Sequence, residues 1–279
     1  MPRGGTTFLY FQLQKHPNVF APLRKETNYF SVLFDRGIEW YQSLFEGAGK
    51  DQVGMDASPV YFMDKKSIER IKTFNPDVRI ILGVRAPAQW SLSFYKQVKS
   101  HSYINSSFPE FLQNHDWNVS EKILPFSIAG NLVSETIEQY KAAFGDNLLM
   151  YDYDFFNKEP LVVLNAIEKF LEIDSYFNEK NFQNIIINSS QRTNIKWLTH
   201  LLKNEKIIEF VSSLLPRKVI HFVRNRVMKM TNPVNTPVYD ETKNENLMHA
   251  KKILFSQDDY VKELFKNAGI VSGSGKSLI

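Results

Sequence analysis

The start of the chain constrains its fold more than any other segment. The run Pro2-Arg3-Gly4-Gly5-Thr6-Thr7 places two glycines between a basic residue and two threonines, and an apolar stretch typical of a helix, residues 8–13, follows at once. Glycine lets the backbone turn tightly and approach a ligand, and the first N–H groups of a helix carry partial positive charge. The segment therefore predicts a loop that holds an anionic group against a helix N-terminus, with Arg3 and the threonine hydroxyls as further donors.

The loop is not of the Walker A type, because no Gly-Lys-Ser/Thr closes it at the required spacing. Loops that cradle phosphate usually follow a buried strand, whereas here Met1 stands where that strand would end. Either the chain lacks the first strand of its sheet, or translation starts here and another element fills the gap. We expect the first alternative, through truncation or a misplaced start.

Strands and helices alternate along most of the chain. Apolar runs indicate strands at residues 19–22, 52–56, 78–84 and 147–151, and helical patterns occupy residues 6–16, 64–74, 132–144, 160–171 and a segment that begins at Pro87. Two short helices separated at Gly37 are expected within residues 29–45, and residues 101–128 are expected to be irregular apart from a short helix near 109–115. This order predicts an α/β fold, a doubly wound parallel sheet flanked by helices, with the ligand at the carboxyl ends of the strands.

The last third of the chain has a different pattern. No strand is expected after about residue 188, so we predict a single domain over residues 1–279, with an α/β nucleotide-binding core at 1–190 and a mainly helical part at 191–279. The run Gly273-Ser274-Gly275-Lys276-Ser277 imitates the end of a Walker A loop, but the chain stops before a helix could follow, and we interpret it as a tail. A basic amphipathic helix at 217–230 indicates a solvated face, with docking to an anionic acceptor or membrane surface as the alternative.

Composition excludes several classes of function. A hydrophobic content of 43% in 279 residues is enough for a full core, and a net charge of +4 is too small to indicate nucleic-acid binding. The chain has no cysteine, which excludes thiolate catalysis and zinc–thiolate sites and indicates a reducing compartment. Without a long apolar run or a signal-peptide pattern, the predicted location is cytoplasmic. No cluster of His, Asp and Glu has ligand spacing, so no metal is predicted.

Four segments, in order, resemble sulfotransferases that use 3′-phosphoadenosine 5′-phosphosulfate (PAPS). The glycine loop resembles their 5′-phosphosulfate loop, and Lys25-Glu26-Thr27-Asn28-Tyr29-Phe30 and Asp56-Ala57-Ser58-Pro59-Val60-Tyr61-Phe62 resemble two segments of the heparan-sulfate-type and bacterial carbohydrate enzymes. The strand at 79–85 with Pro87, Ser93 and Tyr95 is similar to their 3′-phosphate unit. The resemblance implies a P-loop-like fold and transfer of a sulfuryl group from PAPS to a hydroxyl or amine of a carbohydrate, lipid or secondary metabolite.

The same resemblance implies which residues bind the co-substrate. The loop residues Arg3, Gly4, Gly5, Thr6 and Thr7 would hold the 5′-phosphosulfate, and Arg3, where the family usually has lysine, would also stabilise charge in the transition state. The 3′-phosphate would be held by Arg85 and Ser93. The late segment 188–192 resembles one that closes over the nucleotide, which adds Arg192. The family pattern often has a second arginine where this chain has Trp90, an indole that could pack on the sheet or near the adenine.

The base that removes the acceptor proton is predicted to be Glu26. A surface Lys-Glu pair is the alternative interpretation, and the next candidates for the base are His101 and Asp56. The resemblance implies that Lys25, Ser58 and Tyr61 face the acceptor. Where the heparan-type pattern has a lysine before Ser-Pro, this chain has Ala57, a departure that weighs against a glycosaminoglycan acceptor.

Two other classes of function stay open. A kinase-like phosphotransferase would need a Gly-Lys-Ser/Thr loop after a strand and an acidic Mg²⁺ ligand, and we find neither in the sequence. A degenerate family member would bind a nucleotide or glycan without turnover, and the missing strand and Trp90 are compatible with it. The predicted partner is therefore a small-molecule, glycan or lipid acceptor, with no nucleic acid, and peripheral membrane contact is a minor alternative.

Overall fold

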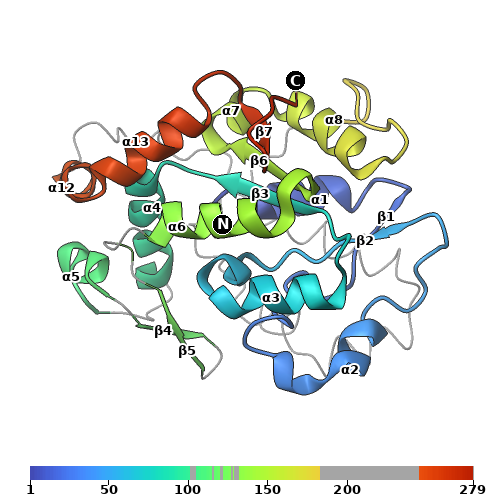
Figure 1. Cartoon of the computed structure of the whole chain (residues 1–279), viewed down its shortest axis with the longest axis horizontal. Coiled ribbons are helices and arrows are strands. Elements are labelled where there is room, and N and C mark those ends of the chain that lie inside the picture. The colour runs from blue at the N-terminus through green and yellow to red at the C-terminus, as the bar shows by residue number, and fades with distance from the viewer. Residues whose placement is uncertain are drawn as a thin grey trace. The chain divides into compact units, whose positions relative to one another are not determined.

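A short sheet lies at the centre of the described part of the chain (Figure 1). The computed structural model describes residues 1–100, 105–114, 116–119, 122–126, 128, 132–182 and 245–278. Within these residues β3 (Ile80–Val84), β6 (Leu148–Asp152) and β7 (Ile270–Ser272) form one sheet in the order β3-β6-β7. The strands β3 and β6 are parallel, and β7 is antiparallel to β6. A separate parallel pair joins β1 (Val19–Phe20) to β2 (Val53–Gly54).

Alternate side chains of β6 enter two different cores, as the period of a strand requires. Leu148 and Met150 belong to the core that contains residues of α3 (Lys65–Phe74), α4 (Pro87–Ser100) and α6 (Leu132–Phe144). Leu149 and Tyr151 belong to the core formed with α1 (Thr6–Leu13) and α8 (Pro160–Leu171). Helices therefore cover both faces of the sheet, which confirms the predicted doubly wound α/β architecture.

The remaining elements connect these layers. They are α2 (Ile38–Ser43), α5 (Phe108–Leu112), α7 (Tyr153–Lys158), α12 (Glu245–Ile253), α13 (Phe255–Leu264), the hairpin strands β4 (Asp116–Val119) and β5 (Lys122–Pro125), and the 3-10 turns Phe34–Arg36, Pro59–Met63 and Gly145–Asn147. Local signals explain several helix starts: the Asp64 side chain accepts from the Lys66 N–H to cap α3, and α8 begins with Pro160. The helices predicted at 132–144 and 160–171 are confirmed with those bounds.

Three expectations about the elements are wrong. Residues 101–128 contain the antiparallel pair β4–β5 in addition to the short helix, so this stretch is not irregular. The helix α7 follows β6 directly and has no counterpart in the prediction. A strand, β7, does occur after residue 188. It has three residues and is stabilised by pairing with β6, more than a hundred positions earlier, so no local pattern reveals it.

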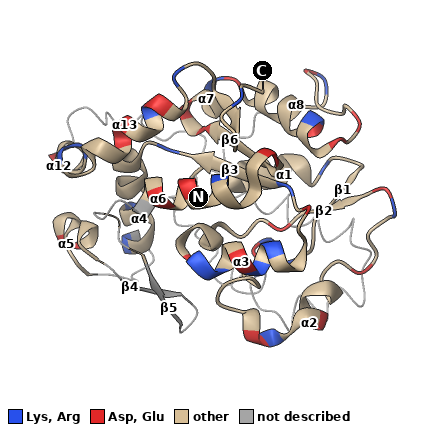
Figure 2. Cartoon of the chain, in the orientation of Figure 1, with Lys and Arg blue, Asp and Glu red and all other residues tan. Residues whose placement is uncertain are grey.

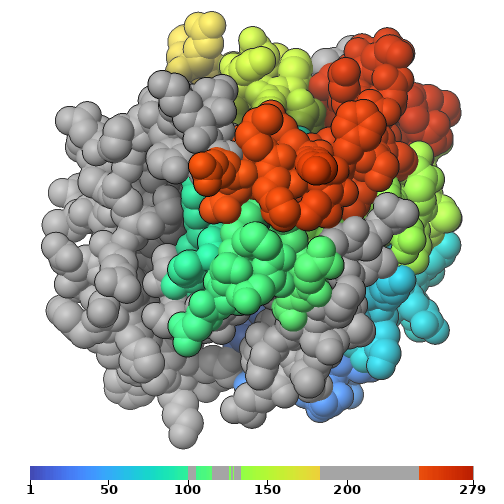
Figure 3. Space-filling model, turned by 90° about the vertical axis from the view of Figure 1, so that its left-hand side faces the viewer, coloured from blue at the N-terminus to red at the C-terminus, as the bar shows by residue number. Residues whose placement is uncertain are grey.

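The C-terminal helices pack against the first half of the chain. Figure 3 shows α12 and α13 lying over α4 and α5. From α13, the Asp258 carboxylate accepts from the Ala88 N–H at 2.9 Å, at the start of α4, and Gln257 accepts from the Val133 N–H in α6 at 3.1 Å. Residues 1–183 and 240–279 accordingly form one compact unit. Among the described residues, no helix combines the length and apolar character needed to cross a membrane.

The glycine- and serine-rich end of the chain folds back beside the sheet. The Gly273 N–H donates to the Leu148 carbonyl at 2.8 Å, at the start of β6, and Gly275 N–H donates to Ser272. Lys276 pairs with Asp146 at 3.6 Å. This run, interpreted above as a tail, is therefore a turn packed at the amino end of β6, the end of the sheet away from the glycine loop.

Candidate functional site

The first five residues lie along β3 and are held from both sides. The Met1 amino group donates to the Gly83 carbonyl at 3.1 Å, and the Tyr151 hydroxyl of β6 donates to the Gly4 carbonyl at 2.8 Å. The two chains approach so closely that a Cβ atom at Gly4 would stand 2.6 Å from the Gly83 oxygen. Only glycine fits at such a contact. The predicted loop is therefore seated at the carboxyl half of the sheet.

The backbone of the loop takes left-handed conformations before α1 begins. Arg3 has φ 60° and Gly5 has φ 82°, and Gly5 is the N-cap of α1 without a side-chain cap. Thr6 and Thr7 form the first turn, where N–H groups have no partner within the helix. A Cβ atom at Gly5 would meet the Phe156 ring at 3.0 Å. These features are those of a loop that turns backbone N–H donors toward an anion.

Two arginines and a serine converge beside this loop. The Arg3 Nε donates to the Ser93 Oγ at 3.0 Å, which joins the loop to α4. Arg85 directly follows β3, and its guanidinium carbon lies 4.6 Å from the centre of the Tyr153 ring, just after β6. Burial lowers the pKa of Arg3, and the positive charge of Arg85 lowers it further. Two desolvated cations near each other favour an anionic ligand, so the structure brings together the residues predicted for both phosphate groups.

Trp90 of α4 contacts the main chain of the glycine loop. Its side chain is fully buried on α4, its ring stacks against Phe94, and its Nε1 donates to the Pro2 carbonyl at 2.9 Å. Of the two roles considered for this indole, packing in the core is the one observed. Trp90, which stands where the family pattern often has an arginine, thus holds the loop by a hydrogen bond to the main chain of the loop.

The Lys25-Glu26 pair lies on an irregular segment, with the Lys25 side chain mostly buried and Glu26 exposed. The Lys25 Nζ and Glu26 Oε1 are 2.7 Å apart, and the Glu26 side chain is 48% exposed. The Tyr10 hydroxyl of α1 donates to the Pro22 carbonyl at 2.9 Å, which fixes the approach to this segment against the helix that follows the loop. The assignment of Glu26 as the base stays a prediction.

Ser58 and Tyr61, predicted to face the acceptor, meet at a carboxylate. Asp56 accepts from the Ser58 hydroxyl at 2.6 Å through Oδ1, and from the hydroxyls of Thr27 at 2.6 Å and Tyr61 at 2.7 Å through Oδ2. Burial raises the pKa of the Asp56 carboxyl, and these three hydroxyl donors, together with the Tyr41 hydroxyl, oppose that shift. Their acceptor-facing role stays a prediction. Sequence reasoning missed the part played by Thr27, whose only signal is its place after Glu26.

An oxygen atom that already accepts hydrogen bonds is less available to take a proton. Both oxygens of Asp56 are engaged in this way, but burial raises the pKa of its carboxyl and with it the affinity for a proton, so its role as the alternative base stays a prediction. The other alternative, His101, and the predicted nucleotide residue Arg192 lie outside the described residues, as does the basic helix 217–230. His16, by contrast, is a buried core histidine whose Nε2 lies 2.9 Å from the Asp174 carbonyl.

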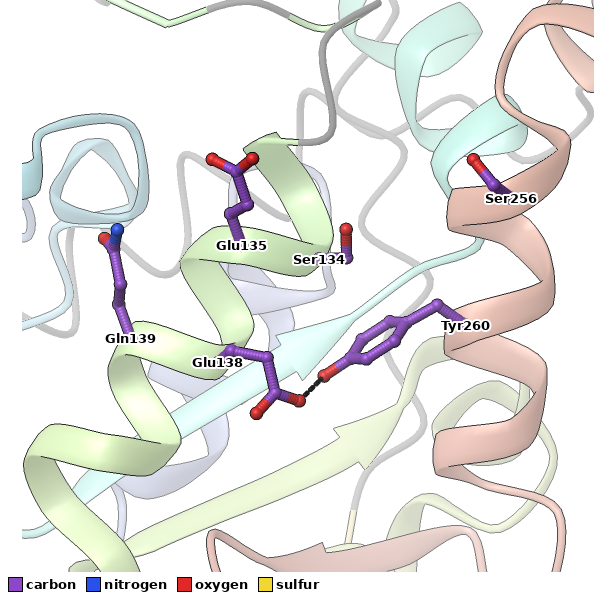
Figure 4. A pocket seen from close by; sticks show the side chains of 6 residues that line it. All are labelled: Ser134, Glu135, Glu138, Gln139, Ser256 and Tyr260. Carbon is purple, nitrogen blue, oxygen red and sulfur yellow. Dashed lines mark hydrogen bonds between the residues drawn. The ribbon is translucent and has the colours of Figure 1, made fainter.

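A pocket of about 620 Å³ lies elsewhere, between α6 and α13 (Figure 4). It is lined by Ser134, Glu135, Glu138, Gln139, Ser256 and Tyr260. The Tyr260 hydroxyl donates to Glu138 across it. None of the predicted site residues lines it, so it is separate from the glycine loop. In the described part of the chain no three His, Asp or Glu residues are grouped to hold a metal ion.

Charges of both signs are distributed over the described residues. In the view of Figure 2, Lys and Arg are interspersed with Asp and Glu along the helices and loops. The positive charge that distinguishes the glycine loop is therefore local, and comes from Arg3, Arg85 and the start of α1.

The fold and this site define an α/β protein that presents a glycine loop and two arginines at the carboxyl ends of its parallel strands. The chain belongs to the sulfotransferase domain family, which matches residues 1–226. A solved structure similar to it is a sulfotransferase from Alicyclobacillus acidocaldarius, with a TM-score of 0.55, 18% identity, and coverage of 83% of this chain and 94% of that one. That likeness shows the shared fold.

Curated relatives match shorter stretches. The chain is 36% identical over 98 residues to heparan sulfate glucosamine 3-O-sulfotransferase 6 of Homo sapiens, covering 35% of this chain and 28% of that protein. It is 32% identical over 146 residues to the membrane-associated sulfotransferase kil1 of Dictyostelium discoideum, covering 51% and 30%. With heparan sulfate glucosamine 3-O-sulfotransferase 5 of Homo sapiens it shares 27% identity over 193 residues, covering 64% and 53%. The chain thus spans between about a quarter and a half of these relatives, and its own location in the cell stays a prediction.

Proposed function

We propose that this protein transfers a sulfuryl group from PAPS to a hydroxyl or amine of an acceptor molecule. The observation that carries the proposal is the convergence of the glycine loop, Arg3, Arg85 and Ser93 at the carboxyl ends of β3 and β6. PAPS carries a phosphosulfate and a separate 3′-phosphate, and this site offers two cationic groups and a hydroxyl as well as the N–H donors of α1. Membership of the sulfotransferase domain family supports the same assignment.

The reaction needs little covalent chemistry from the protein. The bond between sulfur and the phosphate oxygen breaks, a bond forms between sulfur and the acceptor oxygen or nitrogen, and 3′,5′-bisphosphoadenosine leaves. By analogy with phosphoryl transfer, the transition state is loose, so catalysis depends on positioning and charge stabilisation. Arg3 would stabilise the charge that develops on the leaving phosphate. Glu26, which is accessible to solvent, would take the acceptor proton. The reaction as proposed uses no metal.

For the acceptor class we propose a carbohydrate first, with lipids and secondary metabolites as alternatives. Relatives named as heparan sulfate glucosamine 3-O-sulfotransferases support a glycan. Ala57, which replaces a lysine of the heparan-type pattern, weighs against a glycosaminoglycan in particular. The kinase-like alternative is disfavoured by the family match, and binding without turnover is the outcome to test against.

The test combines ligand binding with turnover. A ligand at 100 times its dissociation constant adds about 2.7 kcal/mol to the free energy of unfolding. We expect 3′,5′-bisphosphoadenosine to raise the melting temperature and ATP and GTP to leave it nearly unchanged. Incubation with ³⁵S-labelled PAPS and a panel that includes heparan sulfate, a glycolipid and a phenol should then label one acceptor class. Equal stabilisation by ATP would contradict the proposal, and bisphosphate binding without transfer would favour the non-catalytic alternative.

A further inference from the structure

The carboxylate of Asp56 organises the backbone that follows the Lys25-Glu26 pair. Each of its hydroxyl donors in turn contacts the main chain of that segment. The Asn28 N–H donates to the Ser58 Oγ at 2.9 Å, and the Phe30 N–H donates to the Tyr61 hydroxyl at 3.3 Å. The Tyr29 N–H donates to the Thr27 Oγ1 at 3.3 Å. Three successive N–H groups therefore end on hydroxyls whose own hydrogens point to one carboxylate.

This segment needs such support because no regular structure supplies it. Residues 21–28 form no helix or strand, and Asn28 has φ 55°, a left-handed conformation that a non-glycine residue seldom adopts. Thr27 is fully buried and lies between Glu26 and Asn28 in the sequence. Its hydrogen bond to Asp56 is thus the anchor nearest to the predicted base.

A carboxylate is suited to this position. An ionised carboxylate only accepts hydrogen bonds, so all three hydroxyls must donate to it and keep their lone pairs for the backbone N–H groups. An amide at the same place would also donate, and at least one hydroxyl would have to turn and release its N–H partner. The orientation of the whole cluster therefore depends on the two acceptor oxygens of Asp56 as well as on its size.

From these contacts we infer that Asp56 is a positioning residue, which acts through Thr27 to fix the Lys25-Glu26 segment for transfer to the acceptor. Its catalytic consequence rests on the function proposed above. The sequence offers a matched comparison, because Asp64 is a second buried aspartate that bonds to the same region. Its carboxylate accepts from the Ser31 Oγ at 2.8 Å and from the Lys66 N–H at 3.1 Å, but in no described hydrogen bond does that carboxylate accept from Thr27, Ser58 or Tyr61.

The experiment compares Asp56→Asn and Thr27→Val with Thr27→Ser and with the control Asp64→Asn. For each variant we would measure kcat for sulfuryl transfer, the dissociation constant for 3′,5′-bisphosphoadenosine, and hydrogen exchange of peptides covering residues 1–9 and 25–30. Asp56→Asn and Thr27→Val should lower kcat at least tenfold and speed exchange in 25–30. Bisphosphate affinity should change less than twofold, and exchange in 1–9 should stay slow. Thr27→Ser should restore most of kcat because it restores the hydroxyl.

Two outcomes would overturn the inference. One is that Asp56→Asn keeps more than a third of the wild-type kcat. The other is that Asp64→Asn lowers kcat as much as Asp56→Asn, which would indicate a general loss of folding. If the wild-type protein labels no acceptor, the proposed function fails. The hydrogen-exchange data alone then decide whether Asp56 fixes the segment, and unchanged exchange in residues 25–30 of Asp56→Asn would refute the positioning role of Asp56.

Discussion

Under the proposed function, single residues beside the glycine loop select the anion that the site holds. Arg85 directly follows β3 beside Tyr153, in the place where the resemblance puts the 3′-phosphate contact. We expect Arg85→Ala to weaken binding of 3′,5′-bisphosphoadenosine by about 10- to 100-fold, the loss of one or two charge-assisted hydrogen bonds. Affinity for adenosine 5′-phosphosulfate, which has no 3′-phosphate, should change little. Titration calorimetry with both ligands measures the difference.

A second arginine of the same strand region serves as the control. Arg79 precedes β3 at its other end and pairs with Glu172 at 2.5 Å, so Arg79→Ala should affect neither ligand. An equal loss of affinity for both ligands in Arg85→Ala would show that Arg85 supports the fold and does not select the 3′-phosphate.

Glu26 permits an equally specific prediction. Glu26→Gln keeps the size and hydrogen bonding of the side chain but removes its basicity, so kcat should fall by about 10²- to 10⁴-fold. Bisphosphate affinity should be retained, because proton transfer contributes only in the transition state. The control Glu46→Gln alters another exposed glutamate, near the end of α2. A Glu26→Gln protein with more than a third of wild-type turnover would exclude this carboxylate as the base.

At the level of secondary-structure elements, α13 contributes to the stability of α4. The Asp258 carboxylate accepts from the Ala88 N–H and thereby caps the helix that carries Trp90 and Ser93. We expect Asp258→Ala to lower the free energy of unfolding by about 1 kcal/mol, the usual loss for a helix cap, as measured by urea unfolding. Asp259→Ala, which changes the exposed neighbour, is the matched control. A comparable loss in that control would contradict the capping role.

At the scale of the whole molecule, the buried amine of Met1 makes stability depend on pH. Burial lowers its pKa from 8.0 to about 5 in the folded chain. Between these values the unfolded chain binds more protons than the folded one, so the free energy of unfolding should fall as pH drops from 8 toward 5. The full effect of one such shift is about 4 kcal/mol, to be measured by urea unfolding at a series of pH values.

An extended chain provides the control for this prediction. Adding about eight to ten strand-forming residues before Met1 would replace the amino group opposite Gly83 by a neutral peptide N–H. The pH dependence between 5 and 8 should then shrink, because a peptide N–H does not titrate in this range. An extension that leaves the pH dependence unchanged would refute its assignment to the Met1 amine.

Elements and residue types whose signals are local could be predicted from the sequence. The glycine loop before α1, the apolar strand before Arg85, the Asp64 cap of α3 and the prolines at the starts of α4 and α8 all act over a few residues, so their patterns predict the fold class and the place of the glycine loop in it. The same patterns located the Ser-Pro segment but not the partners of its hydroxyls.

Only the tertiary structure decided which distant residues complete the site. The hydrogen bonds of Trp90 to Pro2, of Arg3 to Ser93 and of Thr27 to Asp56 join segments 29 to 90 positions apart, and β7 pairs with a strand more than a hundred residues before it. Such contacts depend on how cores and helices pack. The identity of a residue does not indicate which distant residue will lie next to it once the chain has folded. The family motifs therefore predicted the glycine loop and the arginine after β3, and packing decided how the loop is held.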